Sequence, residues 1–180
     1  MKRALPRTLV ASIAFATVAT AVAGSIDAGD RLEMAAVLES PITPTRAVKI
    51  AEAGGGHVYG YGMEATNRGH WYEVDVLRGD ARLELRIDAT TGKVLGSSPA
   101  PGEDAQGAHA LDGGTLGFGE AIAQAERAGN GPALEASAAG RGDKAHVDVD
   151  IIQDHGKRIT HYRVSMHAGR IETAITGTDA

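Results

Sequence analysis

The sequence predicts an α+β protein made of two repeats, each an antiparallel β-sheet of three to four strands with one helix packed across a face. Two observations predict it. Stretches with apolar residues at helical spacing are each followed by stretches that alternate between apolar and polar residues, which is typical of strands with one covered face. This order of elements occurs over residues 42–96 and again, with a weaker match, over 115–176. Matched order and spacing in adjacent segments indicate an internal repeat.

The first 23 residues have the three parts of a secretory signal peptide. Lys2, Arg3 and Arg7 form a basic start, a mainly apolar run of thirteen residues follows from Leu9, and AlaValAla at 21–23 provides a cleavage site. A run of thirteen residues is shorter than the roughly 20 that cross a bilayer as a helix. We therefore expect a periplasmic or secreted protein with no membrane span after signal removal, and an uncleaved anchor is the alternative.

Composition excludes several classes of function. The chain has no cysteine, so it contains neither disulfides nor a cysteine for a lipid anchor. Its net charge is −5, and loss of the three basic residues of the signal segment makes it −8. Nucleic-acid binding requires clustered lysine and arginine, so nucleic acid is not an expected partner.

Residues 24–41 are expected to form a polar leader and a short helix. Asp30, with Glu33 three residues later, matches a capping box, and the helix should end at Pro41. Its predicted role is to pack against the first repeat.

The first repeat, residues 42–96, begins with a helix. Thr43 is a suitable cap and Pro44 fits the first helical position. The apolar face consists of Pro44, Ala47, Val48 and Ala51, and the glycines at 54–56 end the helix.

Strands are predicted next at 57–66, 71–78, 82–89 and 93–95. Tyr72, Val74 and Val76 in the second strand, and Leu83, Leu85 and Ile87 in the third, should face the helix. The residues between them should form a charged outer face. Residues 97–114 contain several helix and strand breakers and no hydrophobic period, which predicts a linker.

The second repeat, residues 115–176, follows the same plan. Phe118, Ala121, Ile122 and Ala125 repeat the apolar helix face at a constant offset of 74. Residues 146–152 correspond to the second strand, and residues 161–171 to the third strand and its turn. There the offset has grown to 77, which indicates longer loops between the elements.

Three features of the first repeat together resemble the PepSY domain. They are a helix of the form Ala-x-x-x-Ala-Glu followed by glycine, a TyrGluValAspVal strand, and the ending LeuGluLeuArgIleAspAlaThrThrGlyLysValLeu. The second copy departs from this pattern, because Ser165 stands where Asp88 stands in the first and no aromatic residue precedes Val147. The resemblance implies an antiparallel sheet with a helix across one face and a role in restraining peptidases. It implies no catalytic residues and no cofactor.

The charged outer face is the candidate site for a protein partner. Its residues are Glu73, Asp75, Glu84, Arg86 and Asp88. We expect a noncatalytic protein-binding module, with restraint of an envelope peptidase as the specific function. No serine lies in a nucleophile elbow and no cysteine is present, so the sequence predicts no catalytic site.

A second hypothesis is a periplasmic protein that binds a metal or small ligand through surface histidines. The seven histidines are His57, His70, His109, His146, His155, His161 and His167. They have no HExxH or HxH spacing, and we assign none of them as a metal ligand. The stretch Gly60 to Ala65 matches a dinucleotide-binding pattern by letter, but it does not lead from a strand into a helix as that chemistry requires.

Overall fold

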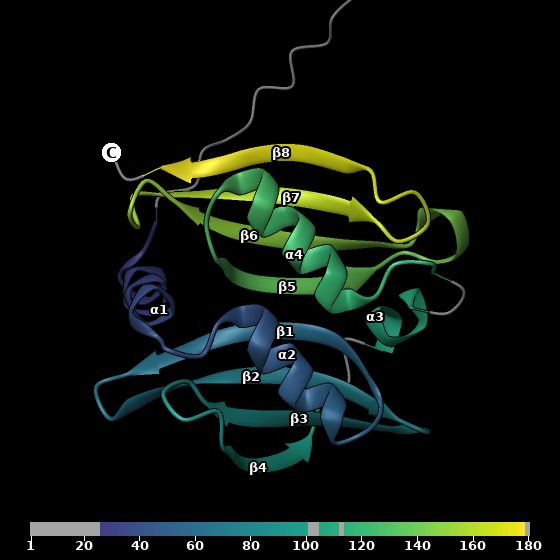
Figure 1. Ribbon diagram of the computed structural model, residues 1–180, viewed down its shortest axis with the longest axis horizontal. Coiled ribbons are helices and arrows are strands. Elements are labelled where there is room, and N and C mark those ends of the chain that lie inside the picture. Colours follow the sequence, from purple (N-terminus) through teal and green to yellow (C-terminus); the bar gives the residue numbers. More distant parts are fainter. Residues whose placement is uncertain (1–25, 101–104, 112–113, 179–180) are drawn as a thin grey trace, which may run out of the picture.

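The computed structural model describes residues 26–100, 105–111 and 114–178. The predicted signal segment, 1–23, lies outside the described residues. The described chain is α+β, with one eight-stranded antiparallel sheet in the order β4-β3-β2-β1-β5-β6-β7-β8 (Figure 1). None of its helices has both the length and the apolar character needed to cross a membrane.

The first half of the sheet follows helix α2, which covers one of its faces. The elements are α2 (Pro44–Ala53), β1 (His57–Thr66), β2 (Gly69–Arg78), β3 (Ala81–Asp88) and β4 (Val94–Pro99). The Thr43 side chain caps α2, with Pro44 in its first turn, as predicted. All four residues of the predicted apolar helix face are buried.

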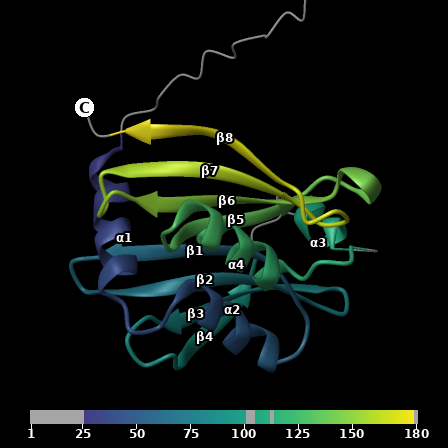
Figure 2. The ribbon, with the colours of Figure 1, turned by 45° about the horizontal axis from the view of Figure 1, so that its top comes forward.

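The second half follows helix α4. The elements are α4 (Phe118–Gly129), β5 (Ala133–Ala139), the 3₁₀ helix η2 (Gly142–Lys144), β6 (His146–Gln153), β7 (Arg158–Ser165) and β8 (Ile171–Thr178). The predicted apolar face of α4 is buried. Helices α2 and α4 lie side by side on the same face of the sheet, joined by a hydrogen bond of 2.9 Å from Thr45 Oγ1 to Glu126 Oε2 (Figures 1 and 2).

The two halves meet at a short seam between β1 and β5. Only two residue pairs are in register there, Gly60 with Ser137 and Tyr61 with Ala136. Beyond these pairs the strands diverge, and a helix packs against both strands at each end: α1 (Ala28–Glu39) at one end and α3 (Ala105–Ala110) at the other (Figure 1). The irregular register in β1 between Val58 and Gly60 places Tyr59 against α3, where it is buried.

The cap of α1 differs from the prediction. Asp27, not Asp30, is the capping residue, and its carboxylate accepts hydrogen bonds from the amides of Gly29 and Asp30 at 2.7 and 2.9 Å. The Asp30 carboxylate accepts from the Asp27 amide at 3.1 Å, which completes the capping box. Glu33 therefore takes no part in the capping box, and its side chain is half-buried.

The segment 97–114, predicted as a linker without regular structure, contains the end of β4 and the short helix α3. The strand continues to Pro99 because it pairs with β3 through Leu83. Helix α3 forms against β1 and β5, and Ala108 and Ala110 are buried there. Both elements depend on tertiary contacts that a local pattern does not contain.

Candidate functional site

The face of the sheet opposite α2 and α4 contains a cavity of about 420 Å³ at the seam. We call it the acidic pocket, because seven carboxylates line it. They are Glu64, Glu73, Asp75 and Glu84 from the first half, and Glu135, Asp148 and Asp150 from the second. His161 also lines the pocket, and no lysine or arginine is among its lining residues.

Strand alternation explains why the carboxylates share this face. In β2 the buried Tyr72, Val74 and Val76 alternate with the pocket residues, and in β6 the buried Val147 and Val149 do the same. Because neighbouring strands are in register, the acidic pocket residues of β2 and β6 lie opposite polar residues of β3, β5 and β7. Two of these cross-strand pairs are acid against acid, Asp75 with Glu84 and Glu135 with Asp150.

Small residues leave the seam open at the centre of the pocket. Gly60, Gly62, Ala136 and Ser137 line it there. A Cβ at Gly60 would come within 2.5 Å of the Asp75 carboxylate, whereas a Cβ at Gly62 would meet no atom within 4 Å. Gly62 therefore borders space that a side chain could enter.

Arg86 stands beside the wall of the pocket that the first half provides. Its Nε lies 3.2 Å from Glu73 Oε1 and 3.5 Å from Glu84 Oε1, and its side chain is 51% exposed. The guanidinium also lies 5.6 Å from the ring centroid of Trp71, whose Nε1 donates to Glu73 at 3.0 Å. Arg86 thus partly neutralises Glu73 and Glu84 from outside the cavity.

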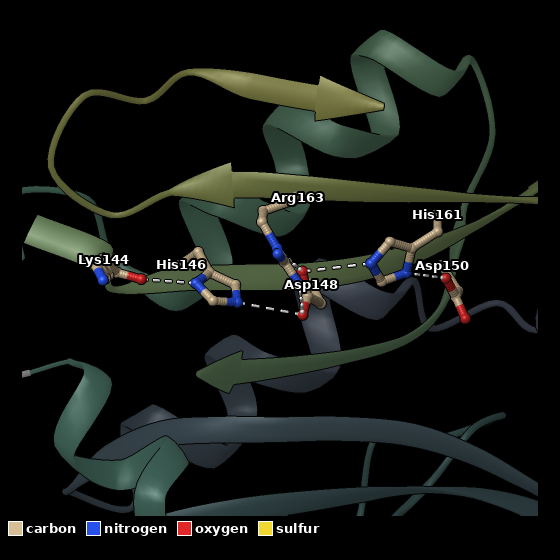
Figure 3. A network of polar contacts seen from close by, with 6 residues as sticks. All are labelled: Lys144, His146, Asp148, Asp150, His161 and Arg163. Carbon is tan, nitrogen blue, oxygen red and sulfur yellow. Dashed lines mark hydrogen bonds and ion pairs between the residues drawn. The ribbon is translucent and has the colours of Figure 1, made fainter. Parts of the chain in front are cut away.

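Asp148 is the centre of a polar network on the wall that the second half provides (Figure 3). Arg163 donates to its two oxygens from Nε and Nη2 at 2.7 and 2.9 Å, while His146 Nε2 and His161 Nε2 lie 3.4 and 3.3 Å away. Desolvation alone would raise the pKa of Asp148, but the hydrogen bond from Arg163 and the nearby charges of His146, Arg163 and His161 together lower it. Asp148 is therefore held as a carboxylate.

His161 links Asp148 to Asp150. Its Nδ1 lies 2.8 Å from Asp150 Oδ1, so the imidazole bridges two carboxylates of the pocket (Figure 3). Only the cationic form of histidine can donate from both ring nitrogens. His146 does not bridge two carboxylates in this way, because its Nδ1 lies 2.7 Å from the Lys144 carbonyl oxygen.

Glu33 of α1 completes the acidic cluster at one end of the pocket. Desolvation, followed by the negative charges of Glu64, Asp30, Glu135 and Asp27, raises the pKa of Glu33 to about 7. Desolvation is also the main cause that raises the pKa of Glu64 and of Glu135. The pKa of each of these three carboxyl groups therefore lies above that of an ordinary glutamate.

Protonation of Glu33 predicts a pH dependence of stability. Its pKa is about 7 in the folded chain against 4.5 for the unperturbed group, so the folded state binds more protons between these values. The contribution of Glu33 to the free energy of unfolding should therefore fall as pH rises from 4.5 to 7 and stay constant above. Glu33→Gln should be more stable than the wild type at pH 8 and equally stable at pH 4, as measured by urea unfolding at each pH.

The control for this prediction is Glu39→Gln, at the exposed end of the same helix. It should reproduce the pH profile of the wild type between pH 5 and 8. If Glu33→Gln also followed the wild-type profile, Glu33 would not be the group responsible.

Three of the five residues predicted as a partner-binding face, Glu73, Asp75 and Glu84, line the pocket. Arg86 lies beside them and is paired with Glu73 and Glu84. The structure does not bring Asp88 to this site.

The Asp88 carboxylate instead organises the turn after β3. It accepts hydrogen bonds from the amides of Thr90 and Thr91 and from Thr91 Oγ1, at 3.1, 2.7 and 2.7 Å. The hydrogen bonds from Thr91 lower the pKa of Asp88. Its role in the described structure is to hold a turn.

Sequence reasoning missed the contribution of the second half to the pocket. Asp148 and Asp150 alternate with buried valines just as Glu73 and Asp75 do, so their outward direction could have been read from the pattern. Glu135 alternates in the same way with the buried Leu134 and Ala136, but the small residues of β5 give a weaker apolar signal than the valines of β6. In the part of the chain that the structure describes, no group of three or more histidine or acidic residues is arranged to hold a metal ion.

Comparisons with known proteins identify no family for this chain. No family model matches the sequence, and no curated protein does. Among solved structures, a "putative lipoprotein" of Clostridium difficile 630 aligns with 76% of this chain and 95% of its own, at 19% identity and a TM-score of 0.41. A likeness of this degree shows neither a shared family nor a shared function.

Proposed function

We propose that this chain is a noncatalytic, exported protein-binding module whose acidic pocket receives a positively charged segment of a partner protein. One observation carries the proposal: seven carboxylates line a single cavity that no lysine or arginine lines. A cationic segment would add positive charge to that which Arg86 and Arg163 supply from beside the cavity.

The cost of this arrangement to folding supports a binding role. Like charges opposite each other on neighbouring strands are destabilising, and Asp75 lies opposite Glu84 in this way. Concentrated negative charge also gives complementary partners faster association. On a surface that only faces solvent, acidic residues opposite each other would lower stability without a functional benefit.

The family and the partner are further parts of the proposal. The order of α2 and its four strands, followed by α4 and its four strands, supports a tandem of PepSY-like repeats over 42–96 and 115–176. The signal-like residues 1–23 support export to the periplasm or the medium. Because the PepSY resemblance implies restraint of peptidases, the proposed partner is an envelope peptidase with a basic surface segment.

Charge reversal in the pocket should remove partner binding. We expect residues 24–180 carrying Glu73→Lys, Asp75→Lys and Glu84→Lys to lose at least about tenfold in affinity for the partner, since each change replaces an attraction by a repulsion. The measurement is affinity capture from an envelope extract of the source organism, quantified by mass spectrometry, with circular dichroism to show that the variant folds.

The matched control carries the same change in charge outside the pocket, as Glu39→Lys, Glu52→Lys and Asp80→Lys, all at exposed positions. A protein retained by the wild type and by this control, but not by the pocket variant, supports the proposal. Equal retention by both variants, or no specific retention by the wild type, contradicts it.

A further inference from the structure

A second cavity, of about 520 Å³, lies where η2 meets the turn between β7 and β8. We call it the basic pocket. The charged and polar side chains that line it are those of Asp143, Lys144, His146, Arg163, Ser165 and Arg170. Three of them are lysine or arginine, although the chain has only 18 such residues against 23 acidic ones. The cavity therefore differs in charge from the acidic pocket, which no lysine or arginine lines.

Backbone contacts hold the two turns that carry Lys144 and Arg170. The Met166 amide donates to the Ala145 carbonyl at 2.9 Å, which ties one turn to the other. The loop that leads to Lys144 is tightly folded, because a Cβ at Gly140 would lie 2.2 Å from the Lys144 carbonyl oxygen. The backbone around the pocket is therefore held without a ligand, which lowers the cost of binding.

Two of the cationic side chains are not neutralised within the described chain. Lys144 and Arg170 form no ion pair with any residue that the structure describes. Arg163 instead donates to both oxygens of Asp148, which balances its charge. Asp143 offsets one of the two other positive charges, so these residues leave one positive charge uncompensated.

One positive charge and several hydrogen-bond donors suit a carboxylate. The ammonium group of Lys144, the guanidinium group of Arg170 and the hydroxyl group of Ser165 can all donate to its oxygens. The Ser165 hydroxyl oxygen accepts from the Ala168 amide at 3.3 Å, and its O–H group can still donate. A carboxylate carries one negative charge, whereas a phosphate group carries about 1.5 to 2 at pH 7. The charge balance therefore favours a carboxylate.

The basic pocket and the acidic pocket adjoin each other on the outer face of the sheet. Arg163 lines the first and Asp148 lines the second, and two hydrogen bonds of 2.7 and 2.9 Å join these side chains. Figure 3 shows Lys144, His146, Asp148 and Asp150 following one another from the basic to the acidic side. Side chains two residues apart on one strand face are about 7 Å apart. Opposite charges of one bound segment can therefore reach both pockets.

We propose that the basic pocket binds a carboxylate side chain of the partner, an aspartate or a glutamate, while the acidic pocket holds a basic side chain of the same segment. This inference rests on the proposed function and specifies its partner, whose recognised segment carries both signs of charge. Adjacent sites of opposite sign fix the direction in which a segment binds, since the reversed order places like charges together. A segment with basic residues alone would leave the positive charge of Lys144 and Arg170 unmatched.

The first experiment is a nuclear magnetic resonance titration of isotope-labelled residues 24–180 with a capped Gly-Glu-Gly peptide, at pH 7.5 and low salt. Amide chemical shifts locate the binding site. We expect saturable shifts at residues 142–146 and 165–170. The capped Gly-Gln-Gly peptide, which has the same shape without the charge, should cause none of them. Inorganic phosphate, titrated in the same way, should bind no more tightly than the glutamate peptide.

Two double variants test the residues of the site. Lys144→Gln with Arg170→Gln should lower the affinity for the glutamate peptide at least about tenfold, because each change removes a charge-assisted hydrogen bond. Lys49→Gln with Arg127→Gln is the matched control, since it removes the same charges from exposed positions on the helices of the opposite face. The control should bind the glutamate peptide as the wild type does. Circular dichroism should show that both double variants fold, because all four side chains are exposed.

A second experiment asks whether the carboxylate belongs to the partner protein. In affinity capture from the envelope extract, Lys144→Gln with Arg170→Gln should retain at least about tenfold less of the protein that the wild type retains, because it loses the contacts of the basic pocket. Lys49→Gln with Arg127→Gln should retain that protein as the wild type does.

The outcomes separate this inference from the proposed function. Equal shifts with the glutamate and glutamine peptides, or equal affinities of the two double variants, would overturn the carboxylate site. Tighter binding of phosphate than of the glutamate peptide would overturn the choice of a carboxylate. Carboxylate binding with unchanged capture would overturn the role of the site in partner binding. In each case the charge reversal in the acidic pocket tests the proposed function by itself.

Discussion

Replacement of Phe118 by alanine is expected to lower the free energy of unfolding by about 3–5 kcal/mol, the usual cost of deleting a buried phenylalanine side chain. Phe118 is 2% exposed and lies in the first turn of α4. Its surroundings include Val58 of the first half and Met166 of the second. The cavity left by alanine would therefore loosen the packing between the two halves.

Urea denaturation measures this change in the free energy of unfolding, provided that its slope against urea concentration is the same for the variant and the wild type. Phe118→Leu is the control, because it keeps most of the apolar volume and should cost less than about 1.5 kcal/mol. A loss below about 1 kcal/mol for Phe118→Ala would show that the residue is not part of the core.

Gly131→Ala should destabilise the fold by roughly 3 kcal/mol or more, at the upper end of the effects of overpacking. A Cβ at this position would lie 1.9 Å from the Ile152 carbonyl oxygen, which is backbone and cannot rotate away. The conflict cannot be relieved cheaply, because the Ile152 amide donates to the Pro132 carbonyl at 2.9 Å and holds the two segments together. The turn between α4 and β5 thus depends on this close approach.

The control for this prediction is Gly62→Ala in β1. It adds the same methyl group at a position where the new Cβ would have no other side chain or distant backbone atom within 4 Å. It should change the free energy of unfolding by less than about 0.5 kcal/mol, as surface substitutions usually do. Similar thermal midpoints for the two alanine variants would contradict the steric account of Gly131.

Local patterns predicted the elements that bury one face. The Thr43 cap, Pro44 and the apolar face of α2 are as predicted, and so is the buried face of α4, because spacing along a helix or strand fixes which side chains point together. The limits of β1, residues 57–66, also agree with the structure. The cap of α1 was predicted at the wrong residue, since both Asp27 and Asp30 satisfy the local pattern and only the observed hydrogen bonds distinguish them.

The candidate site could be predicted only in part. Alternation along β2 and β3 placed Glu73, Asp75 and Glu84 on one outer face. The same pattern could not reveal that Asp88 Oδ1 accepts hydrogen bonds from the following turn, because these bonds depend on the conformation of the chain around Thr90 and Thr91.

Hydrophobic spacing along the chain predicts what each layer contains: two helices with small apolar faces, strands with one buried side, and an outer face rich in carboxylates. That both halves share one sheet depends on long-range pairing. The strand pairing at the seam consists of two residue pairs more than 70 positions apart in the chain, and no local period encodes such a pairing. That seam brings the acidic residues of the two halves around one cavity and places Glu33 beside them, because charges from distant segments accumulate only where the fold joins them.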